Sequence, residues 1–265
     1  MDLWQAVLLG IVQGLSEFLP ISSSGHLELF KALLGVNLEG EASLGFTIYL
    51  HVGTALATIV VFRHTIWDLL KGLFAFRWNA QTRYLALIAV SMVPAGIVGV
   101  FFMDYIDALF TDNVLLVGAM LWVTAVLLFV ADRARHTPKK IGFGSALIIG
   151  ISQAVATIPG LSRSGTTIST SVACGIDRSE AARFSFLMVL PLIFGKIAKD
   201  LMDGGVSMEM SGSGLAIAVG TAVSFVVGIA ACKWMIALVK KAQLKWFAFY
   251  CIAAGTAAIV WELCR

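Results

Sequence analysis

Residues 13–26 read Gln-Gly-Leu-Ser-Glu-Phe-Leu-Pro-Ile-Ser-Ser-Ser-Gly-His, and this polar stretch limits how the rest of the chain can be arranged. It brings an acid, a proline, three adjacent serines and a histidine into a chain dominated by apolar segments. A charged residue at bilayer depth costs about 2.5–3.5 kcal/mol even on the most lenient scale, so such residues usually have a function. The stretch therefore predicts a functional site inside the apolar part of the molecule.

The polar stretch has a counterpart in the second half of the chain. Residues 10–13 (Gly-Ile-Val-Gln) are matched by residues 150–153 (Gly-Ile-Ser-Gln), and residues 22–25 (Ser-Ser-Ser-Gly) by residues 162–165 (Ser-Arg-Ser-Gly). Both matches have the same offset along the chain, so one polar unit occurs twice.

Weaker matches extend the repeat beyond the polar units. Gly45-Phe46 corresponds to Ser185-Phe186 at the same offset, and residues 98–100 (Val-Gly-Val) resemble residues 227–229 (Val-Gly-Ile) at a shifted one. The predicted organisation is a single integral membrane domain, 1–265, with repeat one at 1–135 and repeat two at 141–265.

The composition is that of a membrane protein. The chain is 59% hydrophobic and 13% charged, whereas soluble domains carry about 25% charged residues. Short segments of alternating polarity, typical of a membrane barrel, do not occur, which favours an all-α polytopic protein. The net charge of +3 gives no reason to expect nucleic-acid binding. A cleaved signal peptide is not expected, because the first residues lack a basic start and Glu17 interrupts the apolar region.

Four apolar segments are too short to cross a bilayer, which takes about 20 residues. Residues 2–15 and 22–34 flank Pro20, and residues 141–157 and 162–174 flank Pro159-Gly160. Each pair predicts a re-entrant helical hairpin whose polar tip faces protein or water. Six other segments are long enough to span: 43–62, 84–103, 113–132, 181–201, 213–232 and 246–263.

Each half then consists of a hairpin and three transmembrane helices. Because three is odd, the second half must enter the bilayer from the opposite side, which is the inverted-topology repeat found in transporters. Basic residues gather in segments 63–83, 133–140, 175–183 and 233–245, whereas loop 104–112 holds only acidic ones. The positive-inside rule places the basic loops in the cytoplasm and predicts that both termini lie outside.

The first hairpin carries groups suited to catalysis. Gln13 and Glu17 are four residues apart on one helical face. His26 follows Ser23 by three residues in the first turn of the next helix, which allows a serine–histidine contact.

The second hairpin carries groups suited to binding an anion. Arg163 and Thr167 share the first turn of a helix that Ser162 caps. If the two tips meet, two helix N-termini face one pocket, and helix N-termini and arginine both favour phosphate. The other side chains expected to bind substrate phosphate are Ser22, Ser24 and Ser164.

The charge balance of this pocket indicates a cation. A diphosphate and Glu17 together outweigh Arg163 and the two helix ends, each equivalent to roughly half a charge. A divalent cation, Mg²⁺ or Ca²⁺, held by Glu17 and Gln13 would restore the balance, because magnesium is bound by one or two carboxylates plus substrate phosphates.

Several of these residues also have a structural interpretation. The serines can serve close helix packing, and His26 can be a structural hydrogen-bonding group. Arg163 can form an internal ion pair with Glu17. His51 and His64 are taken as incidental, the first inside a span and the second at its basic edge.

At the two hairpins the sequence resembles the undecaprenyl-diphosphate phosphatase family of bacteria, the BacA type associated with bacitracin resistance. The first family motif is matched by Gln13, Glu17, Pro20, Ser22, Ser23, Gly25 and His26. The second, Pro-Gly-x-Ser-Arg-Ser-Gly-x-Thr, is matched by Pro159, Gly160, Ser162, Arg163, Ser164, Gly165 and Thr167. One departure is Gln13, because better-known members often carry glutamate there.

The resemblance implies hydrolysis of the terminal phosphate of the C55 isoprenyl diphosphate left over from cell-wall polymerisation, at the bacterial inner membrane. It implies Ser23 as nucleophile with His26 as its base, phosphate stabilisation by Arg163 and its neighbours, and a cation on Glu17. A rival assignment makes His26 the nucleophile. The alternative function is a polyprenyl-phosphate flippase, and the many small residues in the spans are compatible with a homodimer.

Overall fold

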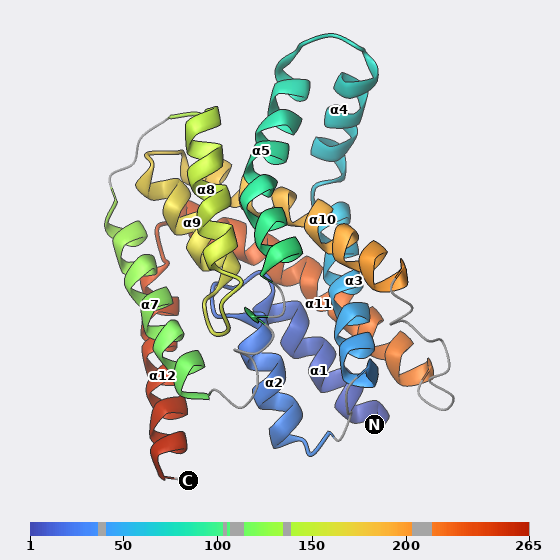
Figure 1. Ribbon diagram of the computed structural model, residues 1–265, viewed down its shortest axis with the longest axis vertical. Coiled ribbons are helices and arrows are strands. Elements are labelled where there is room, and N and C mark those ends of the chain that lie inside the picture. The colour runs from blue at the N-terminus through green and yellow to red at the C-terminus, as the bar shows by residue number, and fades with distance from the viewer. Residues whose placement is uncertain (37–40, 103–104, 107–113, 135–138, 203–213, 265) are drawn as a thin grey trace.

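The computed structural model describes residues 1–36, 41–102, 105–106, 114–134, 139–202 and 214–264. In these ranges the chain forms eleven helices, and the one β-bridge there joins Lys139 and Ile176. Figure 1 shows that α1 begins and α12 ends at one end of the molecule, opposite the turn between α4 and α5. The helices are α1 (Leu3–Ser16), α2 (Ser23–Leu33), α3 (Glu41–Val61), α4 (Arg63–Phe74), α5 (Ala80–Phe101), α7 (Val114–Arg133), α8 (Phe143–Val155), α9 (Arg163–Ala173), α10 (Arg178–Met202), α11 (Gly214–Lys240) and α12 (Lys245–Cys264).

Both predicted pairs of short helices form. The first pair, α1 and α2, has 14 and 11 residues, and the second, α8 and α9, has 13 and 11. None of the four is long enough to cross a bilayer alone. The first break contains Pro20, which disfavours helix at the preceding residue. The second contains Gly160 at φ +85°, where its missing Cβ also lets the backbone pass the carbonyl of Val117.

The two breaks start their second helices differently. Ser162 caps α9 as predicted, because its hydroxyl accepts a hydrogen bond from the Gly165 amide at 3.1 Å. Ser22 stands at the same position before α2, but its side chain caps nothing. Its backbone has φ 71° rather than the extended conformation of a normal N-cap, and its buried hydroxyl has no partner.

A helix lies in the described part of each of the six segments predicted to span, but these helices differ in polarity. Four helices are long and apolar enough to cross a membrane: α5, α7, α11 and α12. A fifth candidate is α3 together with α4, which are bent by 78° at the break between them. Helix α10 covers the predicted span 181–201, yet it does not reach this apolarity among the described residues. The acidic loop 104–112 lies largely outside the described residues.

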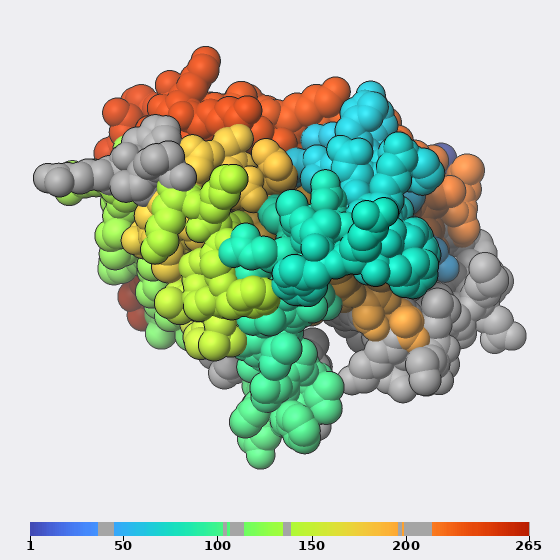
Figure 2. Space-filling model, turned by 90° about the horizontal axis from the view of Figure 1, so that it is seen from above, coloured from blue at the N-terminus to red at the C-terminus, as the bar shows by residue number. Residues whose placement is uncertain are grey.

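The prediction of a plain basic loop at residues 63–83 was wrong. Residues 63–74 form α4, whose exposed face carries Trp67, Leu70 and Lys71, while Leu69 is buried. Apolar and charged residues at helical spacing produce such an amphipathic helix. Seen from above, α5 lies beside α8 (Figure 2).

Helix ends from the two halves are tied together near the basic segments. At the C-terminal end of α7 the Arg178 guanidinium donates to the carbonyls of Asp132 and of Ala134, which follows the helix, at 3.1 and 3.0 Å. The Asp132 carboxylate accepts from the Leu244 and Lys245 amides at the start of α12, at 2.8 and 3.2 Å. Each charge complements the partial charge of the helix end that it contacts. These bonds gather α7, α10 and α12 at one end of the molecule.

Glycines set the closest helix packing. Helix α1 packs against α11 and α8 packs against α5. A Cβ on Gly10 would lie 2.6 Å from the carbonyl oxygen of Gly220, and one on Gly150 would lie 2.3 Å from that of Ser91. No side chain fits at either place without moving a helix, which is how small residues let membrane helices approach.

Gly150→Ala is expected to lower the free energy of unfolding by about 1–3 kcal/mol, because overpacking a tight core costs that much. The measurement is thermal unfolding in detergent. Gly144→Ala in the same helix is the matched control, since nothing lies within 4 Å of its Cβ position. Equal melting temperatures for the two variants would contradict the packing described here.

Candidate functional site

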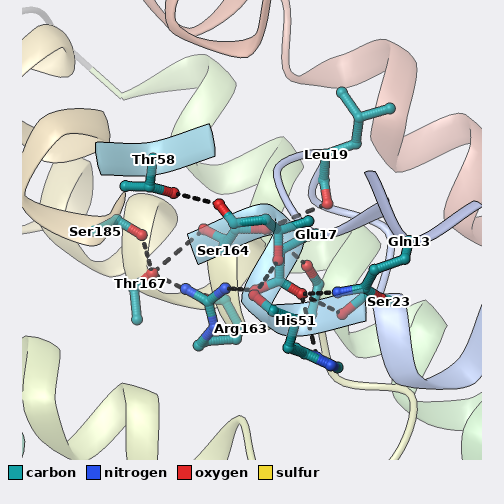
Figure 3. A network of polar contacts seen from close by, with 12 residues as sticks. Gln13, Glu17, Leu19, Ser23, His51, Thr58, Arg163, Ser164, Thr167 and Ser185 are labelled. Atoms are coloured by element: carbon teal, nitrogen blue, oxygen red, sulfur yellow. Dashed lines mark hydrogen bonds and ion pairs between the residues drawn. The ribbon is translucent and has the colours of Figure 1, made fainter. Parts of the chain in front are cut away.

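The two helix breaks meet in space. The Ser164 hydroxyl at the start of α9 donates to the Leu19 carbonyl in the first break at 3.2 Å. The Cβ position of Gly165 lies 3.1 Å from Pro20 Cβ, so the tips are also in van der Waals contact. Figure 3 shows side chains of both breaks converging on one network. The structure therefore brings together residues that are more than half the chain apart.

Glu17 lies at the centre of this network and is only 6% exposed. Its Oε1 forms an ion pair with Nη2 of Arg163. Its Oε2 accepts from Gln13 Nε2 at 3.1 Å and from the Ser23 hydroxyl at 2.9 Å. Nε2 of His51 lies 3.6 Å from the same oxygen (Figure 3). One carboxylate thus joins the first break, the second break and α3.

Arg163 retains capacity for a further anion. Its side chain is 21% exposed, yet Nη1 is buried and has no hydrogen-bond partner in the described part of the chain. Buried donors are normally paired, so an unpaired guanidinium nitrogen favours an oxygen-rich ligand beside it. Arg163 is also the first residue of α9, where backbone N–H groups lack partners in the helix.

Thr167 and Ser162 support this end of α9 through hydrogen bonds within the protein. The Thr167 hydroxyl bonds to the Arg163 carbonyl at 2.8 Å and to the Ser185 hydroxyl at 2.6 Å. The Ser162 amide donates to the Thr124 hydroxyl at 3.1 Å. These bonds fix the direction in which α9 presents Arg163.

His26 does not contact Ser23. Its Nδ1 lies 2.8 Å from the Ser22 carbonyl oxygen, and its Nε2 lies 2.6 Å from the Tyr250 hydroxyl. The expected serine–histidine contact is therefore not formed, because the Ser23 hydroxyl is bound to Glu17 instead. Ser24 is partly exposed, and its side chain makes no hydrogen bond to the described part of the chain.

Two contributors were not anticipated. His51 was taken as incidental, although an ionisable residue inside a span is itself a signal of function; it faces Glu17 across the helix interface. Tyr250 gave no signal in the sequence, since it stands 224 residues from the histidine that it contacts.

The residues present are compatible with the expected cation. Among the described residues, Gln13 Oε1 is buried without a partner and Glu17 Oε1 has only Arg163, so each oxygen can accept one more ligand. The described residues contain no cluster of three or more histidine, cysteine or acidic side chains. A cation here would depend on these two side chains and on oxygens of the substrate, as magnesium commonly does.

Comparison with known proteins gives a match over nearly the whole chain. Residues 6–257 match the family described as bacitracin resistance protein BacA. A protein of Christiangramia forsetii named undecaprenyl-diphosphatase is 55% identical over 98% of both chains. Proteins with the same name from Parabacteroides distasonis and Halothermothrix orenii are 46% identical over 100% of both chains and 38% identical over 98% of both chains.

Proposed function

Because the chain belongs to the BacA family, we propose that it hydrolyses undecaprenyl diphosphate to undecaprenyl phosphate and inorganic phosphate, which recycles the lipid carrier of cell-wall synthesis. The observation that carries this proposal is the half-paired Arg163 beside buried Glu17 at the junction of two helix breaks. Phosphoryl transfer is catalysed mainly by positioning and by stabilisation of negative charge in the transition state, and an arginine and a helix N-terminus stabilise such charge.

We assign the chemical steps from the hydrogen bonds of the site. The Ser23 oxygen attacks the terminal phosphorus, the bond to the bridging oxygen breaks, and undecaprenyl phosphate leaves. The Ser23 hydroxyl already donates to Glu17, so Glu17 rather than His26 is the immediate acceptor of its proton. Glu17 passes this proton to the leaving oxygen. Water then attacks the phosphorus on Ser23, and one water proton returns through Glu17 to the Ser23 oxygen as inorganic phosphate leaves. His26 supplies hydrogen bonding beside Ser23.

Arg163 stabilises the charge that develops on the transferred group, and Ser162, Ser164 and Thr167 hold α9 in place for it. A divalent cation on Glu17 and Gln13 would neutralise further phosphate charge when bound. Glu17 has a second role in the resting state, because its ion pair keeps Arg163 in the site before substrate arrives.

We also propose that the halves are inverted repeats within one membrane domain. Gly10 meets the backbone of Gly220, and its counterpart Gly150 meets that of Ser91. Ser91 stands at the same spacing from Gly220 as Val98 does from Val227, so the two contacts are equivalent.

A reciprocal contact supports the same symmetry. On α7 the Cβ position of Gly118 lies 2.8 Å from the Gly255 carbonyl, and on α12 that of Gly255 lies 2.6 Å from the Gly118 carbonyl. A two-fold relation between two helices produces such self-complementary packing. With the basic helix ends on the cytoplasmic side of the bacterial inner membrane, both termini would be periplasmic.

The test is phosphate release from farnesyl diphosphate by the purified protein in detergent. We expect release in the presence of Mg²⁺ or Ca²⁺ and its loss on chelation. A flippase acts only across a sealed bilayer and releases no phosphate. A protein that moves polyprenyl phosphate across vesicles but releases none in detergent would contradict the proposed hydrolysis.

A further inference from the structure

Both ring nitrogens of His26 are bound, and this fixes its tautomer. The partner of Nδ1 is a carbonyl oxygen, which can only accept, so Nδ1 carries the hydrogen. In the neutral ring the lone pair is then on Nε2, and the Tyr250 hydroxyl donates to it at 2.6 Å. The lone pair of His26 therefore points at Tyr250 and not at Ser23.

Tyr250 holds the ring as well as the nitrogen. The two rings are stacked with their planes 24° apart and their centroids 5.6 Å apart. The next residue, Cys251, donates its thiol to the Pro20 carbonyl at 3.5 Å. Two adjacent residues of α12, Tyr250 and Cys251, thus contact the first break and the start of α2, which are distant from them in the sequence.

The other partner of His26 is held in a costly conformation. Ser22 has φ 71° and ψ 95°, where residues other than glycine are rarely found. Such strain persists only where the surrounding structure enforces it, and it is concentrated at functional sites. Here it places one carbonyl oxygen where it accepts from both the amide of His26 at 3.2 Å and its Nδ1 at 2.8 Å.

We propose that Tyr250 is a positioning residue, which fixes the tautomer and ring orientation of His26 and thereby holds the turn of α2 that carries Ser23. The proposal rests on the function proposed above. The Nδ1–H of His26 binds the carbonyl of Ser22, the residue before Ser23, so the contacts from Tyr250 through His26 to Ser22 set where the Ser23 oxygen lies. No proton is transferred along these contacts. Tyr250 is 44% exposed, whereas His26 is buried.

Tyr250→Phe tests this directly, because it keeps the stacked ring and removes only the hydroxyl. We expect kcat for phosphate release to fall about 10- to 100-fold with KM changed less than about threefold, as when a partner that orients a functional histidine is removed. Tyr105→Phe is the matched control, since Tyr105 is 75% exposed and contacts the ring of Phe102; it should retain wild-type kcat.

Two further measurements separate positioning from a merely structural role. The chain has four histidines, so ¹⁵N labelling of histidine allows the His26 resonances to be assigned with a His26→Ala variant. We expect Nδ1 protonated and Nε2 hydrogen-bonded in the wild type, and a shifted Nε2 resonance in Tyr250→Phe. In the His26→Ala background, Tyr250→Phe should cause no further loss.

Wild-type kcat in Tyr250→Phe with unchanged ¹⁵N shifts would overturn the proposal. So would a loss of kcat on Tyr250→Phe that is equally large in the wild-type and His26→Ala backgrounds. If the wild-type protein releases no phosphate at all, the proposed function fails. The ¹⁵N spectra then decide alone whether Tyr250 fixes the tautomer, and a histidine ring that exchanges between tautomers would reject it.

Discussion

Arg163→Lys is expected to lower kcat/KM for phosphate release by about 10³-fold, the range over which arginines act on a transferring phosphoryl group. Lysine keeps the charge but loses the planar fork that grips two phosphate oxygens. In this site the difference is large, because one guanidinium nitrogen binds Glu17 while Nη1 is buried without a partner. A single ammonium cannot satisfy both positions.

The control for Arg163→Lys is Arg83→Lys. Arg83 donates to the Ile141 carbonyl at 3.4 Å and lies over the ring of Phe143, in the α5–α8 interface. Its replacement should leave phosphate release within about twofold, because single surface substitutions change little. Full turnover by Arg163→Lys, with its fold intact by thermal unfolding, would remove Arg163 from the phosphate site.

The helix breaks could be predicted because their causes are local. Pro20 and Pro159-Gly160 interrupt helices on stereochemical grounds alone, and the repeated motif indicated that the two breaks are equivalent. The contact between the breaks also followed, since Glu17 and Arg163 at bilayer depth each need a partner. The structure pairs them with each other.

The details of the site could not be predicted, because they depend on packing between distant helices. Nothing near Ser22 in sequence indicates φ 71°, and a serine before a helix normally caps it. The Ser23 hydroxyl donates to Glu17, and His26 is bound by Tyr250 of α12, which is distant in the sequence. Helix α4, by contrast, has a local signal, because its apolar and charged residues recur at helical spacing.

The repeat supplies the scaffold but not the chemistry. Glu17 and Ser23 in the first break correspond to Thr157 and Arg163 in the second. One half therefore provides the carboxylate and the hydroxyl, and the other provides the cation. Sequence symmetry predicted where the site lies, whereas the roles follow from the positions at which the two copies differ.

Glu17→Gln is expected to lower phosphate release about 10²–10⁴-fold, the contribution of a well-placed proton acceptor. The amide keeps the shape of the side chain, but it cannot take the Ser23 proton or attract a cation. We also expect the dependence of activity on Mg²⁺ or Ca²⁺ concentration to shift to higher concentration. Adding Gln5→Glu to the Glu17→Gln variant restores its net charge with a new carboxylate near the start of α1. This double variant is not expected to regain activity, so it serves as a charge-matched control.

The same variant separates the catalytic from the structural interpretation of the Glu17–Arg163 pair. Removing one partner of a buried pair costs about 3–5 kcal/mol, and we expect less here, about 1–3 kcal/mol, because the Arg163 side chain is one-fifth exposed. The double variant Glu17→Gln/Arg163→Gln leaves no uncompensated charge, so its melting temperature should recover toward that of the wild type. Its activity should remain lost. If activity returned together with stability, the pair would be an internal ion pair that only holds the two breaks together, and catalysis would have to be sought elsewhere in the molecule.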